Sequence, residues 1–220
     1  QGEVLAVDNV PPVFGPINGP AGWQSTLPIT LTTTVFDWLS GLDSSTAALL
    51  LGDQGRAARL GDPGNPWTEQ QLLAVLDDGD GPIADGIHAA RFRIADQLGT
   101  AQTSEEFPVR IDRTPPEMTA GANLTSGEPI SSPHGWFAGP VLVRVDAWDA
   151  TSGVAGVAYV LDGAPFVIYS APFLLTGDGW HGVRYWAQDL AGNYRESQFF
   201  YAGIDTAPPT VWAQITDGKA

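Results

Sequence analysis

Aspartates recur at matched positions along this chain, and carboxylate oxygens are the hard ligands that calcium prefers. They form two sets of three, Asp37, Asp96 and Asp112 in one half and Asp149, Asp189 and Asp205 in the other. The competing interpretation is turn capping, because an aspartate side chain accepts hydrogen bonds from its own backbone in turns. Because turn capping also explains the aspartates, the sequence predicts no cofactor and assigns no residue as a metal ligand. Calcium is the one ion that these aspartates could bind. A further acidic run at 77–80 lacks the spacing of an EF-hand.

The chain offers little for catalysis. It has three histidines, His88, His134 and His181, and no cysteine, so zinc-ligand spacing is missing. No serine lies on a tight elbow with a base and an orienting acid. A G-x-G-x-x-G pattern at 177–182 precedes a strand pattern rather than a helix, which favours a turn over a dinucleotide loop. The sequence predicts that the chain is not an enzyme and has no catalytic or cofactor-binding residue.

Aromatic side chains could bind a sugar, since their faces are common at interfaces. Trp148 and Trp186 fall on the outward positions of their predicted strands, and Trp38 follows a strand end. The alternative is packing against a neighbouring domain or another chain. Phe36 aligns with Trp148, which favours a structural role there, whereas Trp186 aligns with Arg93 and is the less generic residue.

Charge and composition exclude several partners. The formal net charge of -15 argues against nucleic acid and against an anionic membrane surface. No run of about 20 apolar residues is present, so we expect no membrane span in this segment. The absence of cysteine excludes a disulfide scaffold. Asn123 begins the single N-x-T pattern for glycosylation.

A phrase of the form D-x-x-P-P occurs three times, at 8–12, 112–116 and 205–209. The copies lie roughly 100 residues apart, the usual size of a domain, and such spacing indicates tandem repeats. Residues 85–116 also align without a gap to residues 178–209. The predicted organisation is 1–8, last strand of a preceding repeat; 9–113, first domain with an insertion near 52–84; 114–206, second domain; 207–220, first strand of a following repeat.

The elements that must position these residues are strands. Apolar and polar residues alternate with period two over 29–35 and 141–147, and glycine-rich turns separate such segments. Many short strands with regular turns are typical of a β-sandwich. One segment, 65–76, is ambiguous, because a threonine cap suggests a short helix while its apolar run fits a strand. The predicted fold is all-β, with tandem immunoglobulin-like (Greek-key) β-sandwich domains.

The turn D-L-A-G-N at 189–193, followed by D-T-A-P-P at 205–209, resembles bacterial immunoglobulin-like repeats. The resemblance is strongest over 130–210 and weaker over 9–113, where D-Q-L-G-T at 96–100 replaces the D-x-A-G-N turn. It implies a structural segment of a large extracellular prokaryotic surface protein, such as a stalk, spacer, filament or surface-layer component. The alternative that it implies is a carbohydrate-binding or accessory module of an adhesin or glycan-active enzyme. The implied partners are neighbouring repeats, other copies of the protein and glycans.

Overall fold

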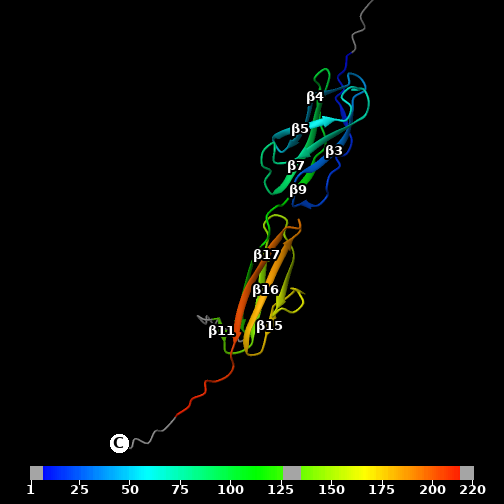
Figure 1. The fold of residues 1–220 in the computed structure, drawn as a ribbon. Helices are drawn as coiled ribbons and strands as arrows, with labels where there is room; N and C mark the ends of the chain where they lie inside the picture. The colour runs from blue at the N-terminus through cyan, green and yellow to red at the C-terminus, as the bar shows by residue number, and fades with distance from the viewer. Residues whose placement is uncertain (1–6, 126–134, 214–220) are drawn as a thin grey trace, which may run out of the picture. The chain divides into compact units, whose positions relative to one another are not determined.

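The computed structural model describes residues 7–125 and 135–213 of the chain. They form two compact units, each containing one β-sandwich (Figure 1). The first unit is Gln1–Pro115 together with the loops Asp149–Gly153 and Asp189–Asn193, and the rest of the chain makes up the second. The described residues contain no helix, and hence none that could cross a membrane. The prediction of an all-β fold is confirmed.

Nine strands build the first sandwich, and their order is β1-β3-β6-β5-β4-β7-β9-β2, with β8 paired to β7. Their bounds are β1 Val13–Phe14, β2 Trp23–Gln24, β3 Ile29–Phe36, β4 Leu42–Leu51, β5 Gln54–Leu60, β6 Gln70–Leu76, β7 Gly86–Asp96, β8 Ala101–Thr103 and β9 Phe107–Ile111. Strand β5 joins the two layers, because its first half pairs with β4 and its second half with β6. Strands β1, β3 and β6 lie in one layer and β2, β4, β7, β8 and β9 in the other, so the chain crosses between the layers several times, as in a Greek-key sandwich.

The extra residues near 52–84 form strands β5 and β6 and their connections. The ambiguous segment is therefore a strand where it is apolar, and the helical alternative for 65–76 was wrong. Leu72, Ala74 and Leu76 are buried while Gln71 and Val75 face outward, so the period is two. The threonine that suggested a cap, Thr68, instead bonds the carbonyl of Asn65 within a turn.

The second sandwich is simpler, with a three-stranded sheet in the order β10-β12-β15 and a five-stranded sheet in the order β11-β17-β16-β13-β14. The bounds are β10 Glu117–Leu124, β11 Trp136–Phe137, β12 Val141–Trp148, β13 Val154–Leu161, β14 Val167–Ile168, β15 Phe173–Leu175, β16 Gly179–Asp189 and β17 Tyr194–Ile204. Strand β14 pairs with β13, and it is shorter than β5 of the first sandwich, which pairs with both β4 and β6.

Each sandwich has its own apolar core. Fully buried side chains of the first core include Leu31, Phe92 and Val109, and those of the second include Val141 and Val183. In β3 every second residue is buried, and in β12 the same holds for Val141, Val143 and Val145, so the alternation is as predicted from sequence. Such burial supplies most of the stability of a domain that has no disulfide.

The described parts of the two ends, residues 7–12 and 205–213, contain no strand. The end strands predicted within 1–8 and 207–220 fall largely on residues 1–6 and 214–220, which lie outside the described residues. Their pairing with neighbouring repeats stays a prediction. The same is true of His134, which also lies outside the described residues.

Candidate functional site

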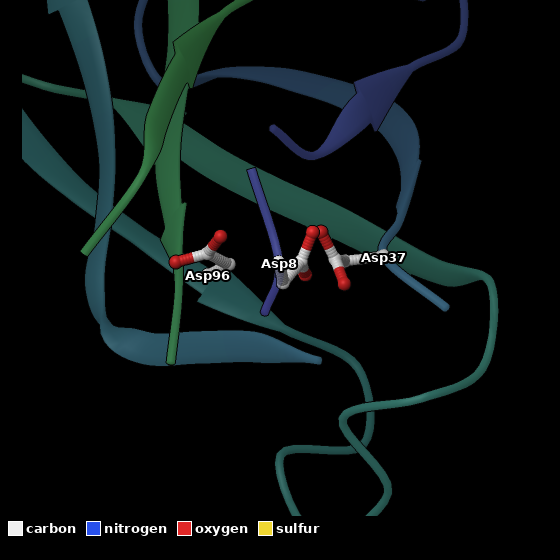
Figure 2. A group of neighbouring side chains, drawn as sticks. All are labelled: Asp8, Asp37 and Asp96. Atoms are coloured by element: carbon white, nitrogen blue, oxygen red, sulfur yellow. The ribbon is translucent and has the colours of Figure 1, made fainter. Parts of the chain in front are cut away.

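Three carboxylates meet at one corner of the first sandwich. Asp8 precedes β1, Asp37 follows β3 and Asp96 ends β7. One oxygen of each lies within 4.8 Å of an oxygen of the others, and all three residues are buried. Figure 2 shows the Asp8 and Asp37 carboxylates side by side, with the Asp96 carboxylate next to them. Segments far apart in sequence thus converge on a small volume of negative charge.

A second corner repeats this arrangement with Asp112, Asp149 and Asp189, whose oxygens also lie within 4.8 Å of one another. Asp112 and Asp189 are buried and Asp149 is half-buried. All three residues belong to the first compact unit, since the loops 149–153 and 189–193 group with it. Each aspartate is the repeat equivalent of one in the first corner.

The sequence correctly predicted Asp37 with Asp96 and Asp149 with Asp189, but the third member of each set was wrong. Asp112 lies with Asp149 and Asp189, and Asp8 takes its place beside Asp37 and Asp96. The reason is the antiparallel pairing of β9 with β7, in which Ile111 lies opposite Gly86 at the start of β7. Asp112, which follows β9, therefore lies at one end of the β7–β9 pair, and Asp96 lies at the other end. Asp205 is separated from Asp189 in the same way by the pairing of β16 with β17.

Asp37 closes the turn that follows β3. Its Oδ1 accepts the N–H groups of Leu39, Ser40 and Gly41, each at a distance of 3.0 Å. Gly41 has φ of 80°, a left-handed conformation that glycine adopts without a Cβ clash. Asp149 closes the equivalent turn by accepting the N–H groups of residues 151, 152 and 153 over 2.8–3.0 Å. The capping interpretation is confirmed for both aspartates.

The aspartate of the repeated D-x-x-P-P phrase bonds the same turn. Asp8 accepts the Ser40 N–H at 2.9 Å, and Asp112 accepts the Ser152 N–H at 3.0 Å. Asp8 also accepts the Val10 N–H at 2.8 Å. This bond is the largest cause of the lowered pKa of Asp8, and hydrogen bonding from Ser40 adds to it. The phrase is thus part of a hydrogen-bonded corner that occurs twice with the same geometry.

The third aspartate distinguishes the two corners. Asp96 Oδ1 accepts the N–H groups of Leu98 at 2.9 Å and Thr100 at 2.8 Å. Asp189 Oδ1 accepts the Asn193 N–H at 2.8 Å, and its Oδ2 accepts the Asn193 side-chain amide, also at 2.8 Å. Among the described residues, no donor to Asp96 Oδ2 corresponds to that amide, and Thr100 stands at the position of Asn193.

Sequence reasoning missed two further aspartates, Asp85 and Asp178. Each accepts hydrogen bonds from residues that directly follow the aspartate of a D-x-x-P-P phrase. Asp85 accepts the Arg113 N–H at 3.0 Å and the Thr114 hydroxyl at 2.6 Å. Asp178 accepts the Thr206 N–H at 3.0 Å and its hydroxyl at 2.8 Å. Their alignment at the start of the matching segments 85–116 and 178–209 was the available signal. Asp8 could have been found from its place in the first copy of the phrase.

The acidic run at 77–80 has structural partners. Asp77 accepts the Gly79 N–H at 2.8 Å. Asp78 accepts the Ile83 N–H and forms an ion pair with Arg113 over 2.7 Å. These two contacts, the first being the larger, lower the pKa of Asp78. The run therefore closes a loop and binds a cationic side chain of the same unit.

The two equivalent histidines begin equivalent strands, as the sequence predicted. His88 bonds the carbonyl oxygen of Ala84 at 2.7 Å, and His181 bonds that of Gly177 at 3.1 Å. His181 also contacts Asp162 at 2.8 Å, and this hydrogen bond is the main reason why its pKa is raised. Burial opposes ionisation of Asp162, but the hydrogen bonds from His181 and the Gly182 N–H outweigh it and lower its pKa.

The five-stranded sheet of the second unit carries an aromatic hollow of about 680 Å³. Its lining includes Phe166, Arg184, Trp186, Phe199 and Tyr201. The Arg184 guanidinium lies 5.6 Å from the centre of the Trp186 ring, and Phe199 stacks on Tyr201 with centroids 6.2 Å apart. Phe199 and Tyr201 are 58% and 59% exposed, which is high for large aromatic side chains.

The other two tryptophans singled out from the sequence lie elsewhere. Trp38 is 72% exposed and stacks on Phe36 with ring centroids 4.3 Å apart. Trp148 is 52% exposed at the end of β12, in the three-stranded sheet. The predicted outward position of Trp148 is confirmed. Trp186 is only half-buried by its aromatic neighbours, so it too has an accessible face.

No protein-family model matches the chain, and no curated protein matches it either. Among solved structures, the chain is similar to the CbhA fibronectin(III)-like modules of Clostridium thermocellum, with 11% identity and a TM-score of 0.35 over 90% of this chain and 100% of that one. It is also similar to dimeric latent PorU from Porphyromonas gingivalis, with 13% identity and a TM-score of 0.37 over 90% of this chain and 21% of that one.

Proposed function

We propose that this chain is a non-catalytic structural segment of a large extracellular prokaryotic surface protein, serving as a stalk, spacer, or component of a filament or surface layer. The observation that carries the proposal is the twice-repeated corner, in which the phrase aspartate bonds the turn that follows the next long strand. A repeated hydrogen-bonded connection of this kind suits a serial array, because each copy reproduces the same local geometry. Neighbouring repeats are the partners that this role requires.

The cores add a second argument. Each sandwich buries its own set of apolar side chains, so each can resist unfolding without the other. Single-molecule stretching of the whole chain tests this role. We expect two separate force peaks, one for each sandwich. A chain that extends without a force peak would contradict a mechanical function.

A second candidate function, glycan binding, is favoured by the aromatic hollow of the second unit. Sugar rings pack against exposed aromatic faces, while a few polar groups fix their orientation. The hollow offers Trp186 and Tyr201 as faces, and Arg184 and Asp162 are polar groups of its lining. Asp162 is held in place because its carboxylate bonds the His181 ring and accepts the Gly182 N–H.

A glycan array tests this candidate with the chain and two single variants. Trp186→Ala removes a face of the hollow, whereas Trp148→Ala removes an exposed tryptophan of the other sheet and serves as the matched control. Binding that is lost only in Trp186→Ala would support a glycan site. Absence of binding by the unchanged chain would eliminate this candidate and leave the structural role unaffected.

A further inference from the structure

We propose that the corner formed by Asp8, Asp37 and Asp96 binds one calcium ion, and that the otherwise equivalent second corner replaces this ion with the side chain of Asn193. The three carboxylates are 8%, 5% and 0% exposed, and their oxygens converge within 4.8 Å. Among the described residues, the ion pairs that form involve other carboxylates. Like charges this close and this buried destabilise one another unless a cation or protons join them.

The observation that points to a ligand is the second oxygen of Asp96. Asp96 Oδ2 is buried and has no hydrogen-bond partner in the described part of the chain. A carboxylate oxygen that is removed from water without a partner is destabilising, so its place in the fold calls for compensation. Hydrogen bonds from Leu98 and Thr100 occupy only Oδ1.

The second corner shows what can provide that compensation. The Asn193 side-chain amide donates to Asp189 Oδ2 at 2.8 Å and to the main-chain oxygen of Asp112 at 2.7 Å. It therefore links the turn aspartate to the phrase aspartate with two hydrogen bonds. Thr100 has no side-chain amide, so the link is missing where Asp96 has its unpartnered oxygen.

Other oxygens at the first corner complete the site. Asp37 uses Oδ1 for its three turn bonds, which leaves Oδ2 for a ligand. The Ser40 hydroxyl is buried at the same corner without a hydrogen-bond partner. The Ser152 hydroxyl of the second corner is also without one, so the serine does not distinguish the corners and Asp96 does.

The chemistry of these donors favours calcium over other cations. Every candidate ligand is a carboxylate or hydroxyl oxygen, and calcium binds about six to eight oxygen ligands in a flexible geometry. Magnesium requires a near-ideal octahedron and retains its waters, and zinc prefers nitrogen and sulfur. The three carboxylates come from separate segments, which suits the flexible coordination geometry of calcium.

Calorimetric titration of the chelator-treated whole chain with calcium chloride tests the proposal, with magnesium chloride as the comparison. We expect one calcium per chain and weaker binding of magnesium. Thr100→Asn introduces the amide found in the second corner, and we expect it to weaken calcium binding by about tenfold or more while raising stability in chelator. Asp96→Asn should weaken binding similarly. Asp53→Asn, an exposed aspartate outside both corners, is the control for lost charge.

Three results would overturn the proposal. The unchanged chain could fail to bind calcium at millimolar concentration, which would leave shared protons as the compensation for the three charges. Calcium could bind equally well to Thr100→Asn and Asp96→Asn, which would place the ion elsewhere. Two calcium ions could bind with equal affinity, which would show that the Asn193 amide does not replace one. Unfolding curves in calcium and in chelator, recorded for every variant, identify any variant that fails to fold.

Discussion

The side-chain amide of Asn193 donates a hydrogen bond of 2.7 Å to the main-chain oxygen of Asp112, although the two residues are 81 positions apart in sequence. Together with its bond to Asp189, this contact ties the aspartate of the repeated phrase to the D-x-A-G-N turn. Both motifs were visible in the sequence as separate features. The structure shows that they form one corner.

Replacement of this amide should destabilise the chain. We expect Asn193→Thr to lower the free energy of unfolding in chelator by about 1–3 kcal/mol, because Asp189 Oδ2 loses its donor in a buried position. If calcium replaces the amide as proposed, the variant should also bind one additional calcium ion. Denaturant unfolding and calorimetry measure the two effects. Asn123→Thr changes an exposed asparagine of β10 and should alter neither, whereas an unchanged stability of Asn193→Thr would show that the amide contributes nothing.

The turn after β3 depends on Asp37. Asp37→Ala leaves the N–H groups of residues 39, 40 and 41 without their acceptor, and we expect a loss of about 3 kcal/mol in the free energy of unfolding. Asp37→Asn retains an acceptor oxygen and should cost less. Equilibrium denaturation in chelator compares the two variants. Equal losses would mean that the charge of Asp37, rather than its hydrogen bonds, stabilises the turn.

His181 should make stability depend on pH near neutrality. Its hydrogen bond with Asp162, and then that with the Gly177 carbonyl, raise its pKa above the usual 6.5, so the protonated form is favoured in the folded state. The stabilisation is fully present below pH 6.5 and is lost as pH rises through the higher folded-state pKa. Unfolding measured at a series of pH values should show this decline in the unchanged chain.

The decline should flatten in His181→Gln. His88→Gln is the matched control, because His88 begins the equivalent strand and bonds a carbonyl but forms no ion pair with a carboxylate among those described. A decline that persists in His181→Gln would assign the pH dependence to another group. A decline that disappears in His88→Gln would likewise assign the pH dependence to a group other than His181.

The two cores should respond separately to truncation. Phe92 is fully buried in the first core, and Phe92→Ala should cost about 3–5 kcal/mol. Val183 is fully buried in the second core, so Val183→Ala should destabilise the other sandwich. Calorimetric melting should show each variant shifting a different transition. A single transition that moves equally in both variants would show that the sandwiches unfold together.

The sequence determined the fold class, because the two signals that define it are local. Period-two alternation in segments such as 29–35 placed every second side chain in a core, and turns rich in glycine and aspartate separated the strands. Repetition of the phrase and of the segments 85–116 and 178–209 indicated two copies of one sandwich. The segment 65–76 stayed ambiguous, since a short apolar run fits a helix or a strand until its pairing partner is known.

The tertiary structure alone decided which residues meet. Asp112 was grouped with Asp37 and Asp96 because they share a repeat, yet the antiparallel pairing of β7 and β9 carries it to the opposite end. Strand direction is a long-range property that residue spacing does not encode. The unpartnered oxygen of Asp96 was hidden for the same reason, because it results from one exchange, Thr100 for Asn193, whose effect depends on what lies across the corner.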